Sequence, residues 1–127
     1  MAENIARFRF LGYKITDSQI HVDSDKQVSE RCDVTFEKTV GIKEAEHRMR
    51  LLLVAKIESE NKALRVEVKA EGYFEFEQDI TDTEKDIFFN TSAPAILFPY
   101  VRAYISTLTG LSGVAPVILP TLNLSNR

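Results

Sequence analysis

The sequence has little cysteine, glycine, proline and histidine, and it has no tryptophan. It contains one cysteine, Cys32, together with five glycines, four prolines and two histidines in 127 residues. A single cysteine excludes an internal disulfide and is typical of proteins in a reducing compartment. With 44% hydrophobic and 28% charged residues, the composition is that of a globular chain. At this length we expect one domain spanning residues 1–127.

The sequence also lacks an excess of basic residues and long apolar runs. The net charge is −3 and the pI is near 5.4, whereas binding to nucleic acid or to anionic membranes needs a basic surface. No apolar run reaches the ~18–20 residues of a membrane span. The N-terminal stretch MAENIARFRF has no apolar signal-peptide core. We therefore expect a cytoplasmic protein with no nucleic-acid partner and no membrane insertion.

The sequence also has no recognisable motif for catalysis or for binding metals or phosphates. H-E-x-x-H, C-x-x-C, a phosphate loop and G-x-S-x-G are all absent. His21 and His47 lie in strand-like segments, and their spacing to Cys32 does not indicate a thiol–imidazole pair. We expect no enzyme, no cofactor and no metal site, and we look for binding surfaces instead.

What the sequence does contain is a series of alternating segments typical of β-strands. In residues 64–77, LRVEVKAEGYFEFE, apolar and charged side chains alternate, which predicts a long strand with one buried and one solvent-facing side. Gly72 in this segment predicts a bend or bulge. Residues 47–59 alternate in the same way, and Asn61-Lys62 predicts a hairpin turn between the two strands. Further strands are predicted at residues 5–15 and 31–40, and a polar loop at 23–30.

Helical signals begin only after residue 80. Thr81 and Glu84 have the spacing of a capping box, which predicts a short helix ending near Phe89. Four strands followed by helices predict an α+β fold, because a parallel sheet would need strands and helices in alternation.

A second, longer helix is expected from Ser92, its N-cap, to the glycines Gly110 and Gly113. Pro94 suits the first turn of this helix, where a missing N–H costs nothing. Pro99 lies deeper in the helix and predicts a kink.

This second helix is more apolar than packing on one sheet requires. At about 100° per residue its apolar side chains span an arc of about 160°, against about 100° for a helix on a single sheet. The polar stripe is narrow and carries one cation, Arg102, beside Ser106 and Thr109, which disfavours an amphipathic membrane helix. Either loops or a second subunit must cover the surplus. The side chains expected at such a subunit interface are Tyr100, Tyr104 and Leu108.

The stretch PAILFPYVRAYISTLTG, followed by LPTLNL at residues 119–124, resembles the C-terminal pattern of SecB-like protein-export chaperones. The pattern of strands and helices agrees over about residues 5–124. The resemblance implies a four-stranded antiparallel sheet with a short helix and one long kinked helix packed on one face. It also implies a cytosolic, ATP-independent holdase that assembles as a dimer of dimers through the long helix.

The same resemblance suggests where clients bind. Members of this family hold unfolded polypeptides in long apolar grooves that touch the second strand and the loop before it. On this chain the corresponding client-binding positions are Cys32, Val34 and Phe36, although sheet core explains Val34 and Phe36 equally well. An apolar groove suits promiscuous capture, because burial of apolar area at about 25 cal/mol per Å² requires no particular sequence.

The acidic side of the segment at residues 64–77 has two explanations, solubility or a docking surface for a basic partner. In relatives that deliver clients to the export motor ATPase, an acidic sheet surface docks the motor, and Glu67 falls at a matching position. Arg65 beside it stands where an apolar residue is expected. The chain ends at Arg127, where longer relatives add a final helix. Two alternatives stay open: a dedicated antitoxin chaperone in a toxin–antitoxin system, and a small-molecule carrier of the same fold.

Overall fold

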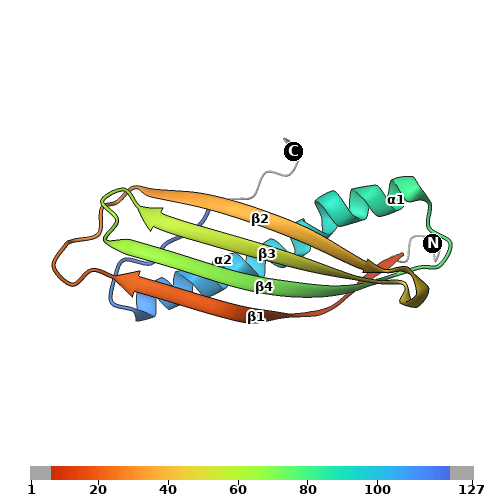
Figure 1. Cartoon of the computed structure of the whole chain (residues 1–127), viewed down its shortest axis with the longest axis horizontal. Helices are drawn as coiled ribbons and strands as arrows, with labels where there is room; N and C mark the ends of the chain where they lie inside the picture. Colours follow the sequence, from red (N-terminus) through yellow and green to blue (C-terminus); the bar gives the residue numbers. More distant parts are fainter. Residues whose placement is uncertain (1–6, 121–127) are drawn as a thin grey trace.

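The computed structural model describes residues 7–120. Four long antiparallel strands form one sheet in the order β1-β4-β3-β2, and the helices lie on one face of it (Figure 1). The strands are β1 (Phe8–Val22), β2 (Cys32–Lys43), β3 (Arg48–Ser59) and β4 (Leu64–Phe76). The helical elements are η2 (Glu44–Glu46), α1 (Asp82–Ile87), η3 (Phe88–Ser92) and α2 (Ala93–Leu111). The predicted α+β class and the four-stranded antiparallel sheet are confirmed.

The core lies between the sheet and α2. Alternate residues of β3 and β4 point toward the helix and are buried, as period-two patterning requires. The largest fully buried side chains of these two strands are Leu51, Leu53, Ile57, Leu64, Val68 and Phe74. From α2, Leu97, Val101 and Ile105 complete the core and are themselves fully buried. Each such side chain contributes roughly 1.5–3 kcal/mol of burial free energy.

Strand β1 is irregular, and its irregularities differ from the one predicted. Register shifts between Phe10 and Gly12 and between Ile15 and Asp17 each insert one extra residue. The first shift turns Tyr13 toward the helix, where it pairs with Gly72, and Gly12 adopts a φ of 129°. The bulge expected at Gly72 is wrong, since β4 pairs with β3 without a shift.

Gly72 instead allows α2 to approach the sheet closely. A Cβ atom on Gly72 would lie 3.3 Å from Leu97 Cδ2 and 3.1 Å from Phe74 Cε1. Both distances are tighter than ordinary contacts, so a larger residue here would push the helix away.

The helical region is one continuous rod, and Ser92 is not an N-cap. Thr81 and Glu84 form the expected capping box at its start, but Ser92 has helical dihedral angles and no capping hydrogen bond. The α1 helix continues into α2 through the π-helical turn η3. Pro94 has no N–H for the carbonyl of Asn90, and Lys38 Nζ donates to that oxygen instead at 2.9 Å.

The predicted end of the long helix is partly wrong. Gly110 lies inside α2, whereas Gly113, with a φ of 91°, follows its end. Pro99 also lies inside α2, where it has no N–H for the carbonyl of Ala95, and the change to π-helical bonding occurs earlier, at η3.

Candidate functional site

A hollow of about 660 Å³ opens where the start of β2, the β1–β2 loop and the segment after α2 meet. One wall is the β1–β2 loop, residues 23–31. The opposite wall is residues 113–120, an extended segment that we call the C-terminal strap. Apolar side chains that line the hollow are Val22, Val28, Cys32, Val34, Val114, Val117, Ile118 and Leu119. We call this hollow the groove.

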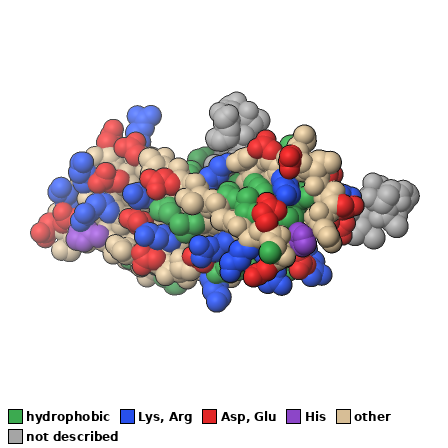
Figure 2. Space-filling model, turned by 45° about the vertical axis from the view of Figure 1, so that its right-hand side comes forward, with side chains coloured by type: hydrophobic (Ala, Val, Ile, Leu, Met, Phe, Trp, Pro, Cys, Tyr) green, Lys and Arg blue, Asp and Glu red, His purple; other side chains and the backbone are tan. Residues whose placement is uncertain are grey.

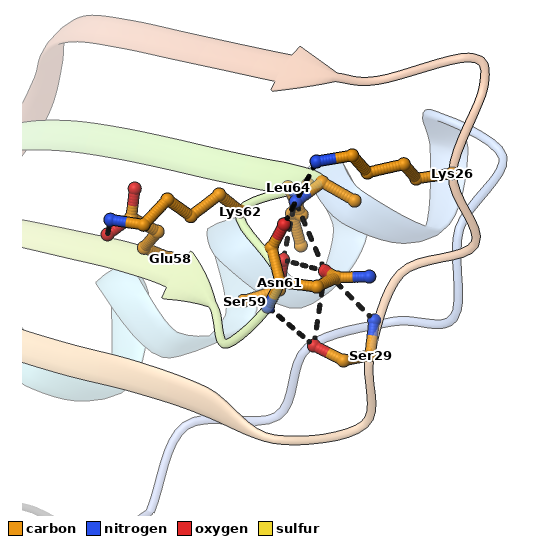
Figure 3. Close-up of polar contacts among 8 residues, drawn as sticks. Lys26, Ser29, Glu58, Ser59, Asn61, Lys62 and Leu64 are labelled. Carbon is orange, nitrogen blue, oxygen red and sulfur yellow. Dashed lines mark hydrogen bonds and ion pairs between the residues drawn. The ribbon is translucent and has the colours of Figure 1, made fainter.

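The loop wall is fastened to the turn between β3 and β4. Its ends are held by backbone bonds, from Asp23 N to the Ala63 oxygen at 2.7 Å and from Glu60 N to the Arg31 oxygen at 2.8 Å. Between these bonds, the side chain of Asn61 contacts the middle of the loop (Figure 3). The loop predicted at residues 23–30 is therefore confirmed, and it is held in a defined position.

The strap wall is fastened to α2 by two polar side chains. Thr109 is fully buried, and its Oγ1 accepts a hydrogen bond from Val117 N at 2.8 Å. Arg102 Nε donates to the Leu119 oxygen at 2.7 Å. The Leu119 side chain is buried in the core with 1% exposure. Arg102 and Thr109 of the predicted polar stripe thus hold the strap against α2. Helix periodicity alone does not predict this role.

The predicted client-binding residues lie in two different places. Cys32 and Val34 line the groove. Phe36, two residues further along β2, is not part of its lining and packs edge-on against Phe98 with ring centroids 5.3 Å apart. Val34 and Phe36 are both half-buried against the core, so the sheet-core interpretation holds for both, and Val34 has a groove-facing side as well.

Cys32 is a titratable group of the groove whose pKa is shifted. Burial raises the pKa of its thiol above the ordinary value of 9.0, and the negative charge of Asp33 raises it further. A raised pKa keeps the thiol protonated at neutral pH, which makes it a weak nucleophile. Among residues 7–120, no group of three His, Cys, Asp or Glu side chains is placed to hold a metal ion. The groove offers a ligand apolar surface from β2 and the strap, and polar and charged side chains from the loop, among them Asp23, Lys26 and Glu30.

The predicted interface residues lie along the flank of α2 that faces β1. Tyr100 stacks on Tyr13 with centroids 4.5 Å apart, and Tyr104 Oη bonds to Ser18 Oγ at 3.0 Å. Leu108 is half-buried against the core. The side of α2 turned away from the sheet is exposed, and most of its residues are small or apolar. These residues are Ala95, Ile96, Pro99, Ala103 and Gly110, with Arg102 and Thr107 as the exposed polar ones.

Glu67 lies on the other face of the sheet, away from the helices. It is directly opposite Lys56 of β3 and Gln19 of β1, and it lines a second hollow of about 550 Å³. We call this the outer hollow. Its lining also includes His21, Asp33, Glu58 and Arg65. Figure 2 shows acidic and basic side chains interspersed over the visible surface, so no large area of one sign is formed there.

No helix within residues 7–120 is both long enough and apolar enough to cross a membrane.

Comparison with known proteins assigns the chain to a family. The family model described as preprotein translocase subunit SecB matches residues 14–126. An uncharacterised protein of Methanocaldococcus jannaschii is 43% identical over 58 residues, which cover 46% of this chain and 37% of that protein. The protein-export protein SecB of Neisseria meningitidis serogroup B is 32% identical over 71 residues, 56% of this chain and 48% of the relative. The matched segments thus span less than half the length of these relatives.

A solved structure shows the same fold over almost the whole chain. It is a SecB-like chaperone of Mycobacterium tuberculosis in complex with a ChAD peptide from the HigA1 antitoxin. The TM-score is 0.78 at 19% sequence identity, and the match covers 96% of this chain and 92% of that one. The arrangement of one antiparallel sheet and a long helix is therefore shared.

Proposed function

The chain belongs to the SecB family, and from that premise we propose that it is a molecular chaperone that holds unfolded polypeptides in the groove without ATP. The observation that carries this proposal is the groove itself. It is open, it is lined by apolar side chains from β2 and the strap and by mostly polar ones from the loop, and it contains Cys32 and Val34, two of the positions that the resemblance implied for client contacts.

The chemistry of the groove suits an extended chain of no fixed sequence. The apolar side chains of the groove stabilise any bound client that has exposed apolar side chains, because the hydrophobic effect depends on the area buried and has no directional requirement. A folded protein presents few contiguous apolar segments, so it would gain little by entering. Selection for the unfolded state follows from this difference.

Two kinds of client are compatible with the family. The relatives from Neisseria meningitidis and Saccharophagus degradans are protein-export proteins, which favours delivery of precursors for export. The structural relative from Mycobacterium tuberculosis binds an antitoxin peptide, which favours a dedicated antitoxin as the client. We place holding of an unfolded chain first, because both roles require it.

We further propose that the chain forms a homo-oligomer, a dimer of dimers, through α2. Ile96 and Tyr100 are 37% and 42% exposed on a helix whose outward side has almost no charge. Apolar helix surface of this kind is typical of protein–protein interfaces. Ile96→Asp should lower the mass measured by light scattering, whereas Thr91→Asp, at an exposed position in the preceding turn, should leave the mass unchanged. An unchanged mass for Ile96→Asp would overturn the role of the outward side of α2.

The chaperone proposal is tested by aggregation of a chemically reduced, unfolded protein. The wild-type chain should suppress light scattering at near-stoichiometric amounts without ATP. Val34→Asp should abolish suppression, because it places a charge on the groove wall. Thr35→Asp, the next residue on the opposite face of β2, should retain suppression. A wild-type chain with no effect even in excess would disprove the proposal.

A further inference from the structure

The β1–β2 loop is attached to the β3–β4 turn by two kinds of contact. The bonds of Asp23 N and Glu60 N use backbone atoms only, so side-chain substitutions in the turn leave their donors and acceptors in place. The middle of the loop has no such backbone bond to the turn among the described residues. Its position depends on side chains: that of Asn61, that of Ser29, and that of Lys26, whose Nζ donates to the Asn61 backbone oxygen at 3.4 Å.

Asn61 bonds to the loop through both ends of its amide. Nδ2 donates to the Gln27 oxygen at 2.7 Å. Oδ1 accepts from Ser29 Oγ at 3.2 Å and from Ser29 N at 3.4 Å. The backbone N–H of Asn61 donates in return to Ser29 Oγ at 3.2 Å. Figure 3 shows Asn61 and Ser29 pointing toward one another across the gap between turn and loop.

The segment that Asn61 holds is part of the groove wall. Gln27, Val28 and Ser29 all line the groove, and Val28 is half-buried against the core. We propose that Asn61 is a positioning residue for client binding, which fixes these three residues as a preformed wall. This proposal rests on the proposed function. Because this wall is ordered before the client binds, binding does not cost the conformational entropy of ordering the loop, and the affinity for the client is higher.

The same side chain also builds the turn, and one of its two polar atoms serves both roles. Oδ1 accepts from Ala63 N at 3.1 Å and from Ser59 Oγ at 3.0 Å within the turn, as well as from Ser29 in the loop. Nδ2 reaches the loop alone, at the Gln27 oxygen. Asn61→Asp therefore preserves the acceptor that the turn and Ser29 share, removes the donor to Gln27, and sets a carboxylate oxygen against the Gln27 carbonyl.

The experiment compares Asn61→Asp with the wild type in two measurements. The first is the affinity for fluorescently labelled, reduced and carboxymethylated α-lactalbumin, a permanently unfolded probe. The second is hydrogen–deuterium exchange of residues 24–30. We expect the variant to bind roughly tenfold more weakly, mainly through faster dissociation. Exchange at residues 24–30 should accelerate, while β3 and β4 stay protected and the melting temperature stays within about 2 °C.

Two further variants control for charge and for folding. Glu60→Gln alters a neighbouring exposed side chain and leaves its backbone bond to the loop in place, so it should match the wild type in both measurements. Ser29→Ala removes the Oγ bonds to Asn61 and leaves the Gln27 bond and the turn in place. Its loss of affinity should be smaller than that of Asn61→Asp, which removes the Gln27 bond.

The outcomes separate this proposal from the chaperone proposal. Wild-type affinity and unchanged exchange in Asn61→Asp would overturn the role of Asn61 and leave the chaperone proposal intact. If the wild-type chain fails to bind the probe, the chaperone proposal fails and a role in client binding fails with it. In that case, faster exchange at residues 24–30 would still establish Asn61 as the fastening of the loop.

Discussion

The groove and the outer hollow are similar in volume, at about 660 and 550 Å³, but they are built in different ways. The groove lies between two irregular segments that are fastened by side chains to regular structure. The outer hollow lies on the sheet itself and is floored by strands that pair without a shift at the residues lining it. The shape of the groove therefore depends on a few side chains, whereas the shape of the outer hollow depends on the backbone of the sheet.

The charges of the two hollows differ as well. Around the outer hollow, opposite charges face each other across strands, as in Lys56 with Glu67 and Glu58 with Arg65. Within residues 7–120 the one ion pair of these four side chains is Glu58 with Lys62, at 3.9 Å. Substitutions here change the charge that a partner meets and leave the fold intact. Substitutions at the fastening points of the groove change its shape. The following predictions test this contrast.

The largest effect is expected at Leu119, which anchors the strap in the core. Leu119→Ala should lower the free energy of unfolding by about 2–4 kcal/mol, because it leaves a cavity and frees one wall of the groove. Urea unfolding measures the loss. The adjacent Ile118→Ala removes a side chain that is 68% exposed and should cost less than about 0.5 kcal/mol. Equal losses for the two variants would show that the strap is not anchored through Leu119.

A smaller effect is expected at Thr109, the polar fastening of the same wall. Thr109→Val keeps the shape of the side chain but removes the acceptor of Val117 N, at a cost of about 1–2 kcal/mol. Hydrogen–deuterium exchange of the Val117 amide should also be faster in Thr109→Val than in the wild type. Thr107→Val, at an exposed position one half-turn away, is the matched control and should be close to neutral. If Val117 stays protected in Thr109→Val, another group holds the strap.

The contrast between the two hollows also explains what the sequence could predict. The strands β3 and β4 were predictable because one face of each is buried, so apolar residues recur with period two. The second half of β1 was not predictable, because each of its two register shifts adds one residue and so changes which of the alternate residues face the helix. Tyr13 and Ile15 consequently face the helix at positions where a regular strand continued from Phe8 and Phe10 would turn them outward, and the second shift restores the first parity at Ser18.

The groove was predictable in its floor and in one wall. The family resemblance pointed to Cys32 and Val34, which belong to a regular strand, and to the loop before that strand. The strap could not be predicted, and neither could the bonds that hold the walls, because the bonds from Thr109 to Val117 and from Asn61 to the loop join regular elements to segments with no periodicity. Ser92 was wrongly predicted as a cap for a related reason. A cap residue and a residue in a π-helical turn have the same sequence signature, and the contact from Lys38 to Asn90 that satisfies this turn comes from β2.

A moderate effect is expected on the alkylation rate of Cys32, whose thiol lies in the groove and should be covered when a client is bound. Since burial and then Asp33 raise the pKa of the thiol, less thiolate is present at pH 8 than in the unfolded chain. Alkylation by iodoacetamide should be slower in the native protein than in urea, and it should keep accelerating above about pH 9. Asp33→Asn removes the second cause and should speed native alkylation about twofold.

Bound client should slow alkylation of Cys32 further, and this control separates groove binding from binding elsewhere. Protection that requires an unfolded protein, and is absent with a folded one, would place the client against the floor of the groove. Equal alkylation rates with and without saturating client would contradict a binding site at Cys32.

The smallest effect is expected at Glu67 in the outer hollow. Glu67→Lys places the introduced ammonium group opposite Lys56 of β3, and exposed like charges cost at most about 0.5–1 kcal/mol. Because the strands beneath keep their pairing, the groove on the opposite face should bind the unfolded probe with unchanged affinity. Binding of a basic docking partner to the sheet should weaken, and salt should reduce the difference. A loss of client affinity in Glu67→Lys, measured alongside an unchanged melting temperature, would mean that the two faces are coupled through the sheet and that the contrast drawn between them is wrong.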